Sequence, residues 1–477
     1  MTSRGNLLRA GAAQVDITPR SLMQMAGEVG WFRPGQYVYD PLYAKALVVD
    51  NNGKKACIVT LDLTIVTREW ASRIREEAAG RLGTDPRAVM VHATQTHTAP
   101  ALGHFMFDKE FKNIPPEMEW LGGGDSRYFP FAYERILQAV EEAHETMQPA
   151  WIRTGSGIEG RVQFNRRAVN HAGMVQMPGP RWQPPLGPTY IRYLEGPIDP
   201  EVGVIVIQNE ALQVLALVLH HTGHPVNVFP KEVISADWCG AWAARMQKRF
   251  GPRCVGLVVN GCCGNINPWN CYDPDYVPDH QRMGRLLAET TANVVDGLTI
   301  EDDVTVDFAS DIVWIPMRDV SPEVLKEARD ILTKHPEPLW CDTAGYAAYE
   351  NNQRASRPPH RTVDAAWMRA AGIMSNYLQK QREPRMDYEI QALRIGRTAV
   401  VGLPGEPFVE GQLRIKLESP TYPTYVAHCC NMYVGYIPTE EAFARGGHEV
   451  FYSKLVPEAL ATIVKHTREL IGTIFKE

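Results

Sequence analysis

Two segments of this chain each join an apolar run to a polar turn that carries histidine, and imidazole could bind a metal ion or move a proton. The first segment, residues 89–100, contains His97, and the second, residues 219–225, contains His224. Imidazole is the commonest metal ligand and a frequent general base. Because sites in α/β proteins gather where strands end, both segments are candidates for a functional site.

Three further turns could supply other groups to such a site. Residues 259–268 contain glycines that allow close backbone approach and amides that can orient a ligand. Residues 401–407 place Glu406 in a rigid turn after an apolar run, and residues 433–439 place Tyr436 in a similar context. Each turn is a weak signal alone, so their meaning depends on their occurring together.

Taken together, these motifs resemble a known family in content and in order. Along the chain they read VDITP at 15–19, ATQTHTAP at 93–100, GHP at 223–225, ISAD at 234–237, GNINP at 264–268, LPGE at 403–406 and GYIPT at 435–439. The order is similar to that of the catalytic domain of the neutral/alkaline non-lysosomal ceramidases, over roughly residues 10–450. The immunoglobulin-like C-terminal domain of the secreted ceramidases has no counterpart in this sequence.

The resemblance implies a metal-dependent amidase. In that family, zinc is held by two histidines, a glutamate and a tyrosine, and it activates water. The matching metal positions here are His224, Glu406 and Tyr436, with Gln95 in place of the other histidine. One nitrogen and two anionic oxygens suit a catalytic zinc with an open position. An amide oxygen is a poorer zinc ligand than imidazole, so the expected cofactor is zinc or another divalent metal.

The resemblance also implies catalytic roles around the metal. His97 matches a histidine that contacts the substrate oxygen, and Arg166 matches an arginine that holds the oxyanion or the substrate. Asn267 replaces a family serine and could orient a ligand or donate to an oxyanion. His448 lies near the position of a family tyrosine and could hydrogen-bond or act as an acid.

The leading hypothesis is a metal-dependent hydrolase that acts on a small polar amide or a sugar derivative rather than on ceramide. Two alternatives stay open. His97, His448 and Tyr436 could serve as acid and base in a metal-independent carbohydrate-active enzyme, a lyase or a glycosidase. A degenerate binding protein without turnover would also show the changes at Gln95 and Asn267.

Composition narrows the partners and the compartment. The net charge of the 477-residue chain is -6, from 55 acidic and 49 basic residues, which disfavours a basic nucleic-acid binder. No apolar run has the length of a signal peptide or of a membrane helix. Nine cysteines, with adjacent pairs at 262–263 and 429–430, are typical of a reducing compartment. We expect a cytoplasmic protein with a small-molecule substrate, no nucleic acid and no membrane segment; a homo-oligomer stays open.

The elements that must position these residues indicate an α/β fold. Near-continuous apolar runs predict strands covered on both faces, at 46–49, 57–61, 89–91, 202–207, 214–219 and 255–259. Helical patterns fall at 68–82, 133–147, 238–250 and 281–298, strands resume at 388–402, and a helix closes the chain. A helical excursion at about 320–385, with a polar loop at 351–362, is a candidate lid, and the alternative that its helices are ordinary core helices stays open. We expect a mixed β-sheet core flanked by helices, in a single domain spanning residues 1–477.

Overall fold

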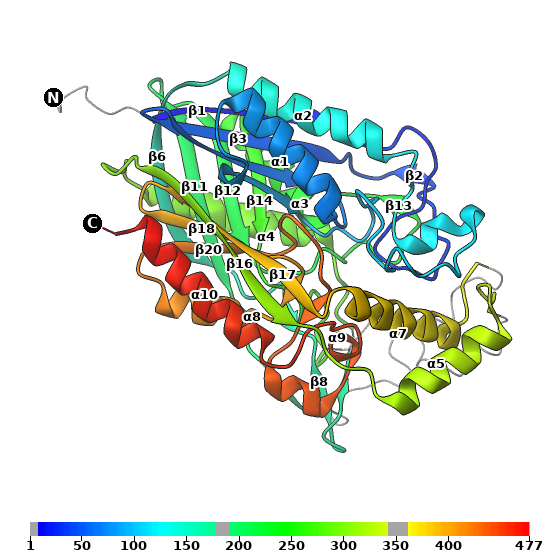
Figure 1. Ribbon diagram of the computed structural model, residues 1–477. Helices are drawn as coiled ribbons and strands as arrows, with labels where there is room; N and C mark the ends of the chain where they lie inside the picture. The colour runs from blue at the N-terminus through cyan, green and yellow to red at the C-terminus, as the bar shows by residue number, and fades with distance from the viewer. Residues whose placement is uncertain (1–7, 178–190, 274, 342–360, 477) are drawn as a thin grey trace.

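Two β-sheets pack face to face in this protein, and helices cover the outer face of each sheet (Figure 1). The computed structural model describes residues 8–177, 191–273, 275–341 and 361–476. The mixed-sheet α/β architecture expected from the sequence is confirmed. In these ranges, none of the helices has both the length and the apolar character that crossing a bilayer requires.

The larger sheet has eight strands in the order β14-β12-β11-β6-β1-β3-β4-β5. Their bounds are β1 (Leu8–Asp16), β3 (Tyr43–Asn51), β4 (Lys54–Leu61), β5 (Val89–Ala93), β6 (Gln148–Ile158), β11 (Glu201–Asn209), β12 (Val214–His221) and β14 (Val255–Asn260). The pairs β4–β5 and β12–β14 are parallel, and the others are antiparallel. All the apolar runs predicted as strands lie in this sheet. The runs do not predict β1, which is rich in Ala and Gly, or β6, which alternates with polar residues.

The smaller sheet has the order β16-β17-β18-β20. Its strands are β16 (Val306–Pro316), β17 (Arg385–Ile395), β18 (Thr398–Gly402) and β20 (Thr424–Ala427). The predicted strand region 388–402 is therefore two strands, joined by a tight turn at Gly396, whose φ of 60° favours glycine. Helices α8 (Val409–Glu418) and α10 (Ala459–Ile474) pack on the outer face of this sheet.

Strand β4 shows why the apolar runs are nearly continuous. Its residues alternate between two cores, because successive side chains of a strand point to opposite faces. Ala56 and Ile58 pack between the two sheets, whereas Cys57 and Val59 pack under the helices on the other face. Both faces of the strand are buried from residue 56 to residue 61, so the run contains no charged side chain.

Four helices cover the outer face of the larger sheet: α1 (Arg68–Leu82), α2 (Phe129–Glu145), α3 (Asp237–Phe250) and α4 (His280–Gly297). Each overlaps a predicted helix, and α1 has the predicted bounds. The start of α4 is fixed by Asp279, whose side chain accepts hydrogen bonds from the backbone N–H groups of Gln281 and Arg282.

The helical excursion consists of α5 (Pro322–Lys334) and α7 (Ala365–Arg382). Ser321 caps α5 by accepting a hydrogen bond from the backbone of Val324, as its position before a proline indicates. The two helices pack around Trp367 against the short helix η2 (Pro116–Gly122). Most of the predicted polar loop 351–362 lies outside the described residues.

Short elements complete the described chain. The minor strand pairs are β2 (Tyr37–Val38) with β13 (Val233–Ile234), β7 (Phe164–Asn165) with β15 (Ile266–Asn267), and β19 (Glu406–Pro407) with β21 (Tyr436–Ile437); β8 (Ala168–Asn170) pairs with β9 (Val175–Gln176) and β10 (Ile191–Leu194). The short helices are η1 (Pro86–Ala88), η3 (Glu440–Arg445) and α9 (His448–Phe451).

The segment that follows β20 joins the two edge strands of the larger sheet. On one side, the backbone of Ala93 in β5 donates to the carbonyl of Cys429, and that of Asn431 donates to Val91. On the other side, the backbone of His428 donates to the carbonyl of Asn260 at the end of β14. The carboxyl ends of β5, β14 and β20 therefore meet at one place, where several loops of the predicted site begin.

A buried ion pair on the larger sheet gives a first prediction about stability. Lys45 Nζ lies 2.9 Å from Asp62 Oδ2, and the exposed fractions of the two side chains are 2% and 0%. Replacing Lys45 by methionine leaves the Asp62 carboxylate buried without its cation, which costs about 3–5 kcal/mol. Urea unfolding at pH 7 measures this change in the free energy of unfolding.

The matched control for Lys45→Met is Lys54→Met, which removes a lysine from an exposed ion pair with Asp307. Exposed pairs contribute about 0–1 kcal/mol, so this variant is expected to unfold close to the wild type. Equal losses in the two variants would contradict the importance of burial at Lys45.

Candidate active site

The predicted metal positions come from the ends of different strands and meet in the buried interior. Gln95 follows β5, and His224 follows β12. Glu406 and Tyr436 are direct partners in the parallel pair β19–β21, which places their backbones side by side. Gly264 allows a third loop to approach, because a Cβ atom at this position would lie 2.4 Å from the Glu406 carbonyl oxygen.

His224 and Glu406 face each other with two hydrogen-bond acceptors. The Nδ1 of His224 is 2.9 Å from the Cys263 carbonyl oxygen, so Nδ1 carries the proton and Nε2 carries a lone pair. Nε2 lies 3.6 Å from Glu406 Oε2, and both side chains are almost fully buried. Neither atom has a hydrogen-bond partner among the described residues.

A cation bound between these two buried acceptors would give both of them a partner. Without one, each unpaired polar atom in the interior costs folding free energy. Tetrahedral zinc has bonds of about 2.0–2.2 Å to nitrogen and oxygen, which puts two of its ligand atoms about 3.4 Å apart. The distance of 3.6 Å between Nε2 and Oε2 is close to that value. The donor set therefore fits a divalent metal.

The pKa shifts of His224 and Glu406 in the metal-free protein agree with a metal site between them. Burial lowers the pKa of His224 well below its ordinary value, and Arg166 and His97 lower it further. Burial also raises the pKa of Glu406, although Arg166 and a hydrogen bond from Tyr433 act in the opposite direction. A bound cation would favour both the neutral imidazole and the charged carboxylate.

Tyr436 lies beside this pair as a protonated phenol. Burial raises its pKa well above 10, and the negative charge of Glu406 raises it further, while Arg166 opposes both effects. A cation that bound the phenolate would have to displace the proton, so metal affinity is expected to rise with pH.

Gln95 occupies its position with an unusual backbone. Its φ is 69°, in the left-handed region that few residues other than glycine adopt, and its side chain is buried. The side chain lies close to Glu406 and also 3.0 Å from His428 Nε2. Strained backbones of this kind cluster at functional sites.

Arg166 is held by a buried acidic residue. Its Nε donates to Glu449 Oε1 at 2.7 Å, and its guanidinium carbon lies 5.3 Å from the centre of the Tyr436 ring. The second oxygen of Glu449 accepts from Arg167 at 2.7 Å. One Arg166 nitrogen, Nη2, is buried with no acceptor among the described residues, so it can donate to a bound ligand.

The two remaining candidate histidines are the more accessible ones. His97 is partly exposed, and its ring centre lies 5.0 Å from that of His224. Its Nδ1 donates to the Gln95 carbonyl at 2.9 Å, which leaves Nε2 to accept a proton. His448 is exposed at the start of α9 and lies edge-on to Tyr436, with ring centres 5.4 Å apart.

Asn267 and the neighbouring cysteines are fully buried. Asn267 Oδ1 accepts a hydrogen bond from the backbone of Trp269 at 3.1 Å, while its Nδ2 has no acceptor within the described ranges. Burial raises the thiol pKa of Cys262 and Cys263, which agrees with a structural role for both. All nine cysteines lie within the described residues, and none of them forms a disulfide there.

Comparison with known proteins identifies the architecture. No family model and no curated protein sequence matches the chain. A crystal structure of neutral ceramidase from Pseudomonas aeruginosa matches 98% of this chain and 74% of its own, with a TM-score of 0.69 and 18% sequence identity. This chain has the neutral ceramidase fold. A structure of a ceramidase complexed with C2 covers the same 98%, with 75% of its own chain, a TM-score of 0.66 and 16% identity.

The likeness confirms the resemblance seen in the motifs at the level of the fold. No immunoglobulin-like sandwich is present among the residues that the structure describes. The neutral ceramidase fold brings Gln95, His97, His224, Glu406 and Tyr436 together in this chain. Their chemical roles remain predictions that rest on the geometry above.

The sequence did not predict four residues that surround the candidate site: His428, His92, Tyr433 and Glu449. His428 follows the apolar run of β20, as other histidines follow β5 and β12, so the same signal could have found it. Tyr433 donates to Glu406 Oε1 at 2.7 Å, and no local pattern marks it. His92 accepts a hydrogen bond from the backbone of Asn260 at 3.1 Å.

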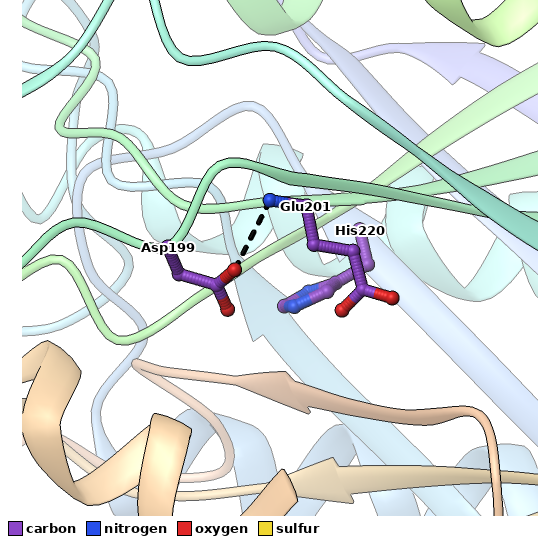
Figure 2. A group of neighbouring side chains, drawn as sticks. All are labelled: Asp199, Glu201 and His220. Carbon is purple, nitrogen blue, oxygen red and sulfur yellow. Dashed lines mark hydrogen bonds between the residues drawn. The ribbon is translucent and has the colours of Figure 1, made fainter.

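A second group of side chains in this ceramidase-like fold could also bind a metal (Figure 2). One ligand atom from each of Asp199, Glu201 and His220 lies within 4.8 Å of the others. However, the ammonium of Lys416 bonds both carboxylates, and it lies 2.6 Å from Asp199 Oδ2. Since this internal cation already pairs with both carboxylates, we place the candidate metal at His224 and Glu406.

Buried histidines make the stability of the metal-free protein sensitive to acid. Burial lowers the pKa of His92 to about 3 and that of His221 and His428 to about 4, from an ordinary value of 6.5. Below pH 6.5 the unfolded chain binds protons that the folded chain does not. Each histidine therefore lowers the free energy of unfolding by up to about 1.4 kcal/mol per pH unit, until its folded pKa is reached.

Urea unfolding between pH 6.5 and pH 5 tests this prediction, because most carboxylates stay charged in that range. A steep fall in the unfolding free energy is expected, and His221→Asn should make the slope shallower. A flat profile over this range would show that these histidines are not held neutral by burial.

Proposed function

We propose that the protein is a metal-dependent hydrolase that cleaves an amide bond in a small polar substrate. The observation that carries the proposal is the buried pair of acceptors, His224 Nε2 and Glu406 Oε2, neither of which has a hydrogen-bond partner within the described part of the chain. Tyr436 and Gln95 complete the proposed ligand set. A divalent cation held there supplies a Lewis acid and lowers the pKa of a water molecule.

The residues around the proposed metal would bind the substrate and handle charge. Arg166 presents its unpaired Nη2 to the negative charge that develops on the substrate oxygen, and Glu449 keeps the guanidinium in that orientation. Asn267 offers a second donor through Nδ2. Such preorganised donors stabilise a transition state without reorganising when the reaction takes place.

Two histidines could move protons at the accessible side of the site. His97 is neutral, with Nδ1 bound to the Gln95 carbonyl, so Nε2 can accept a proton from the attacking water. His448 is exposed beside Tyr436 and can donate a proton to the leaving amine. In this proposal His97 is the general base and His448 is the general acid.

Two observations support the proposed substrate class: the bond that the matched proteins' names imply, and the residues around the proposed metal. The matched proteins are named ceramidases, and ceramide is an N-acyl amide, so an amide is the bond class we propose. The groups that face the proposed metal are imidazoles, an amide and a buried guanidinium, which bind polar ligands. We therefore propose a small N-acylated amine or amino sugar rather than a ceramide.

A panel of N-acyl amines, N-acyl amino sugars, ceramide and uronic-acid glycosides tests the proposal. We expect hydrolysis of a polar amide, reduced at least about 100-fold by a chelator and restored by added divalent metal. Chelator-resistant cleavage of a glycoside would favour acid/base chemistry by His97, His448 and Tyr436 instead. Absence of any turnover across the panel would favour a binding protein.

A further inference from the structure

The buried side chain of Gln412 connects helix α8 to two loops of the candidate site. Its Oε1 accepts a hydrogen bond at 2.7 Å from the backbone N–H of Cys262, in the loop after β14. Its Nε2 donates to Thr222 Oγ1 at 2.7 Å, in the loop after β12, and to Asp199 Oδ2 at 2.6 Å. Because Gln412 is fully buried, losing one of these bonds would leave a buried polar group unpaired, which is costly.

The partners of Gln412 allow its amide only one orientation. Asp199 Oδ2 also accepts a hydrogen bond from the ammonium of Lys416 at 2.6 Å, and the backbone of Glu201 donates to Oδ1 at 3.0 Å (Figure 2). An ionised carboxylate only accepts hydrogen bonds, and a backbone N–H only donates. The NH₂ group of Gln412 must therefore face Asp199, and its oxygen must face Cys262.

The two loops and α8 approach each other so closely that only glycine fits between them. A Cβ atom at Gly261 would lie 2.1 Å from Thr222 Oγ1 and 2.6 Å from Gln412 Oε1. Both distances are well below a van der Waals contact of about 3.5 Å. The three segments therefore meet at a fixed separation, with the bonds of Gln412 at their point of contact.

The same two loops hold His224, and the segment before α8 carries Glu406. Thr222 precedes His224 by two residues, and the carbonyl oxygen of Cys263 in the other loop lies 2.9 Å from His224 Nδ1. Helix α8 begins three residues after Glu406, so the backbone of Glu406 and the helix move together. Gln412 therefore joins the segment of Glu406 to the segments that hold His224.

We propose that Gln412 is a positioning residue that fixes the separation of His224 and Glu406. This inference rests on the proposed function, in which these two side chains bind one metal ion. Their facing atoms, Nε2 and Oε2, lie 3.6 Å apart, close to the spacing that tetrahedral zinc requires. Residues that orient metal ligands without touching the metal contribute about 10- to 100-fold to metal affinity.

Competition for Zn²⁺ with a chromophoric chelator tests this role without any measurement of activity. Gln412→Met keeps the length of the side chain and removes its hydrogen bonds, so zinc affinity is expected to fall by about 10- to 100-fold. An affinity equal to that of the wild type would overturn the positioning role.

The matched control is Gln391→Met, in strand β17. Gln391 is also fully buried, and its side chain also makes three hydrogen bonds, to Arg87, Val89 and Asn431. Urea unfolding is expected to show similar losses of stability in the two variants, whereas Gln391→Met keeps the wild-type zinc affinity. Equal losses of zinc affinity in both variants would overturn the proposal, because affinity would then follow stability alone.

Thr222 provides a milder pair of variants on the same connection. Thr222→Val removes the hydroxyl that accepts from Gln412, and Thr222→Ser keeps it. Zinc affinity is expected to fall about tenfold in Thr222→Val and to stay near the wild-type value in Thr222→Ser. Equal affinities in the two variants would contradict the role of this hydrogen bond.

Hydrogen exchange in the metal-free protein tests the positioning independently of metal binding, because amide exchange reports local opening of the backbone. In Gln412→Met, backbone amides at 222–224 and 261–263 are expected to exchange about tenfold faster or more, and in Gln391→Met at the wild-type rate. Unchanged exchange in Gln412→Met would overturn the positioning role. Wild-type protein that binds no zinc would contradict the proposed function, while the exchange rates still decide whether Gln412 holds the two loops.

Discussion

Replacing Glu406 by glutamine is expected to abolish metal binding and hydrolysis while leaving the fold intact. Glu406 supplies the only charged carboxylate of the proposed ligand set, and its Oε2 lies 3.6 Å from His224 Nε2. A unit charge pair at about 4 Å contributes about 4 kcal/mol at an effective dielectric constant of about 20, and a divalent ion contributes more. Metal affinity is therefore expected to fall by about 10³-fold or more.

The same substitution should affect the stability of the metal-free protein in the opposite direction. Burial raises the pKa of Glu406, so its charged form is disfavoured in the folded chain when no cation is bound. Glutamine removes that charge and can still accept the hydrogen bond from Tyr433. The melting temperature of metal-free Glu406→Gln is expected to equal or exceed that of the wild type.

Glu410→Gln is the matched control, because Glu410 lies four residues further along the chain, in the first turn of α8, and accepts a hydrogen bond from Asn265. It is expected to bind metal like the wild type. Metal competition and thermal unfolding on the three proteins measure both effects. Wild-type metal affinity in Glu406→Gln would contradict the proposed ligand set.

Replacing Glu449 by alanine is expected to give the largest loss of stability around the site. Glu449 bonds Arg166 and Arg167, each at 2.7 Å, and all three side chains are almost fully buried. The two arginines lower the pKa of Glu449 to about 2, against the effect of its burial. Removing the carboxylate leaves buried positive charge without its partner, which costs about 3–5 kcal/mol of unfolding free energy.

A double variant separates the structural role of Glu449 from its role at the site. Arg166→Met/Glu449→Ala removes both the acid and one buried arginine, so it should recover part of the lost stability. It should stay inactive, because Arg166 Nη2 is the proposed donor to the substrate oxygen. Recovery of activity in the double variant would contradict the role of Arg166.

The control for Glu449→Ala is Glu289→Ala, which breaks an exposed pair with Arg285 on the surface of α4. Exposed helical pairs of this spacing contribute about 0.3–0.5 kcal/mol. Urea unfolding compares the variants at one pH. A loss below about 1 kcal/mol for Glu449→Ala would show that this acid does not hold the two arginines in place.

The strands and helices could be predicted from the sequence where a local pattern of residue types, such as an apolar run or a terminal glycine, determines them. The run at 57–61 predicts β4 because both of its faces are buried. The helix at 68–82 ends at Gly83, which adopts the left-handed conformation that ends many helices. Strand β1 was missed because its burial depends on the neighbouring strands and not on its own residue types.

The candidate site could be predicted only in part for a similar reason. His224 and Glu406 lie in turns after apolar runs, and the order of the motifs pointed to them. The pairing of Glu406 with Tyr436 takes place in strands of two residues each, which no periodicity reveals. Arg166 and Glu449 are separated by 283 residues, so their ion pair follows from the tertiary fold alone. The position of His428 depends on how the segment after β20 joins the edges of the larger sheet.

The most direct test of the proposed metal centre is a crystal structure of protein soaked in turn with Mn²⁺ and Zn²⁺, with anomalous-scattering data for each metal. The account predicts an anomalous peak between His224 Nε2 and Glu406 Oε2, within bonding distance of both atoms, and none at Asp199 and Glu201, where Lys416 already supplies the positive charge. A peak only at Asp199, Glu201 and His220, or no peak beside Glu406 with either metal, would contradict it.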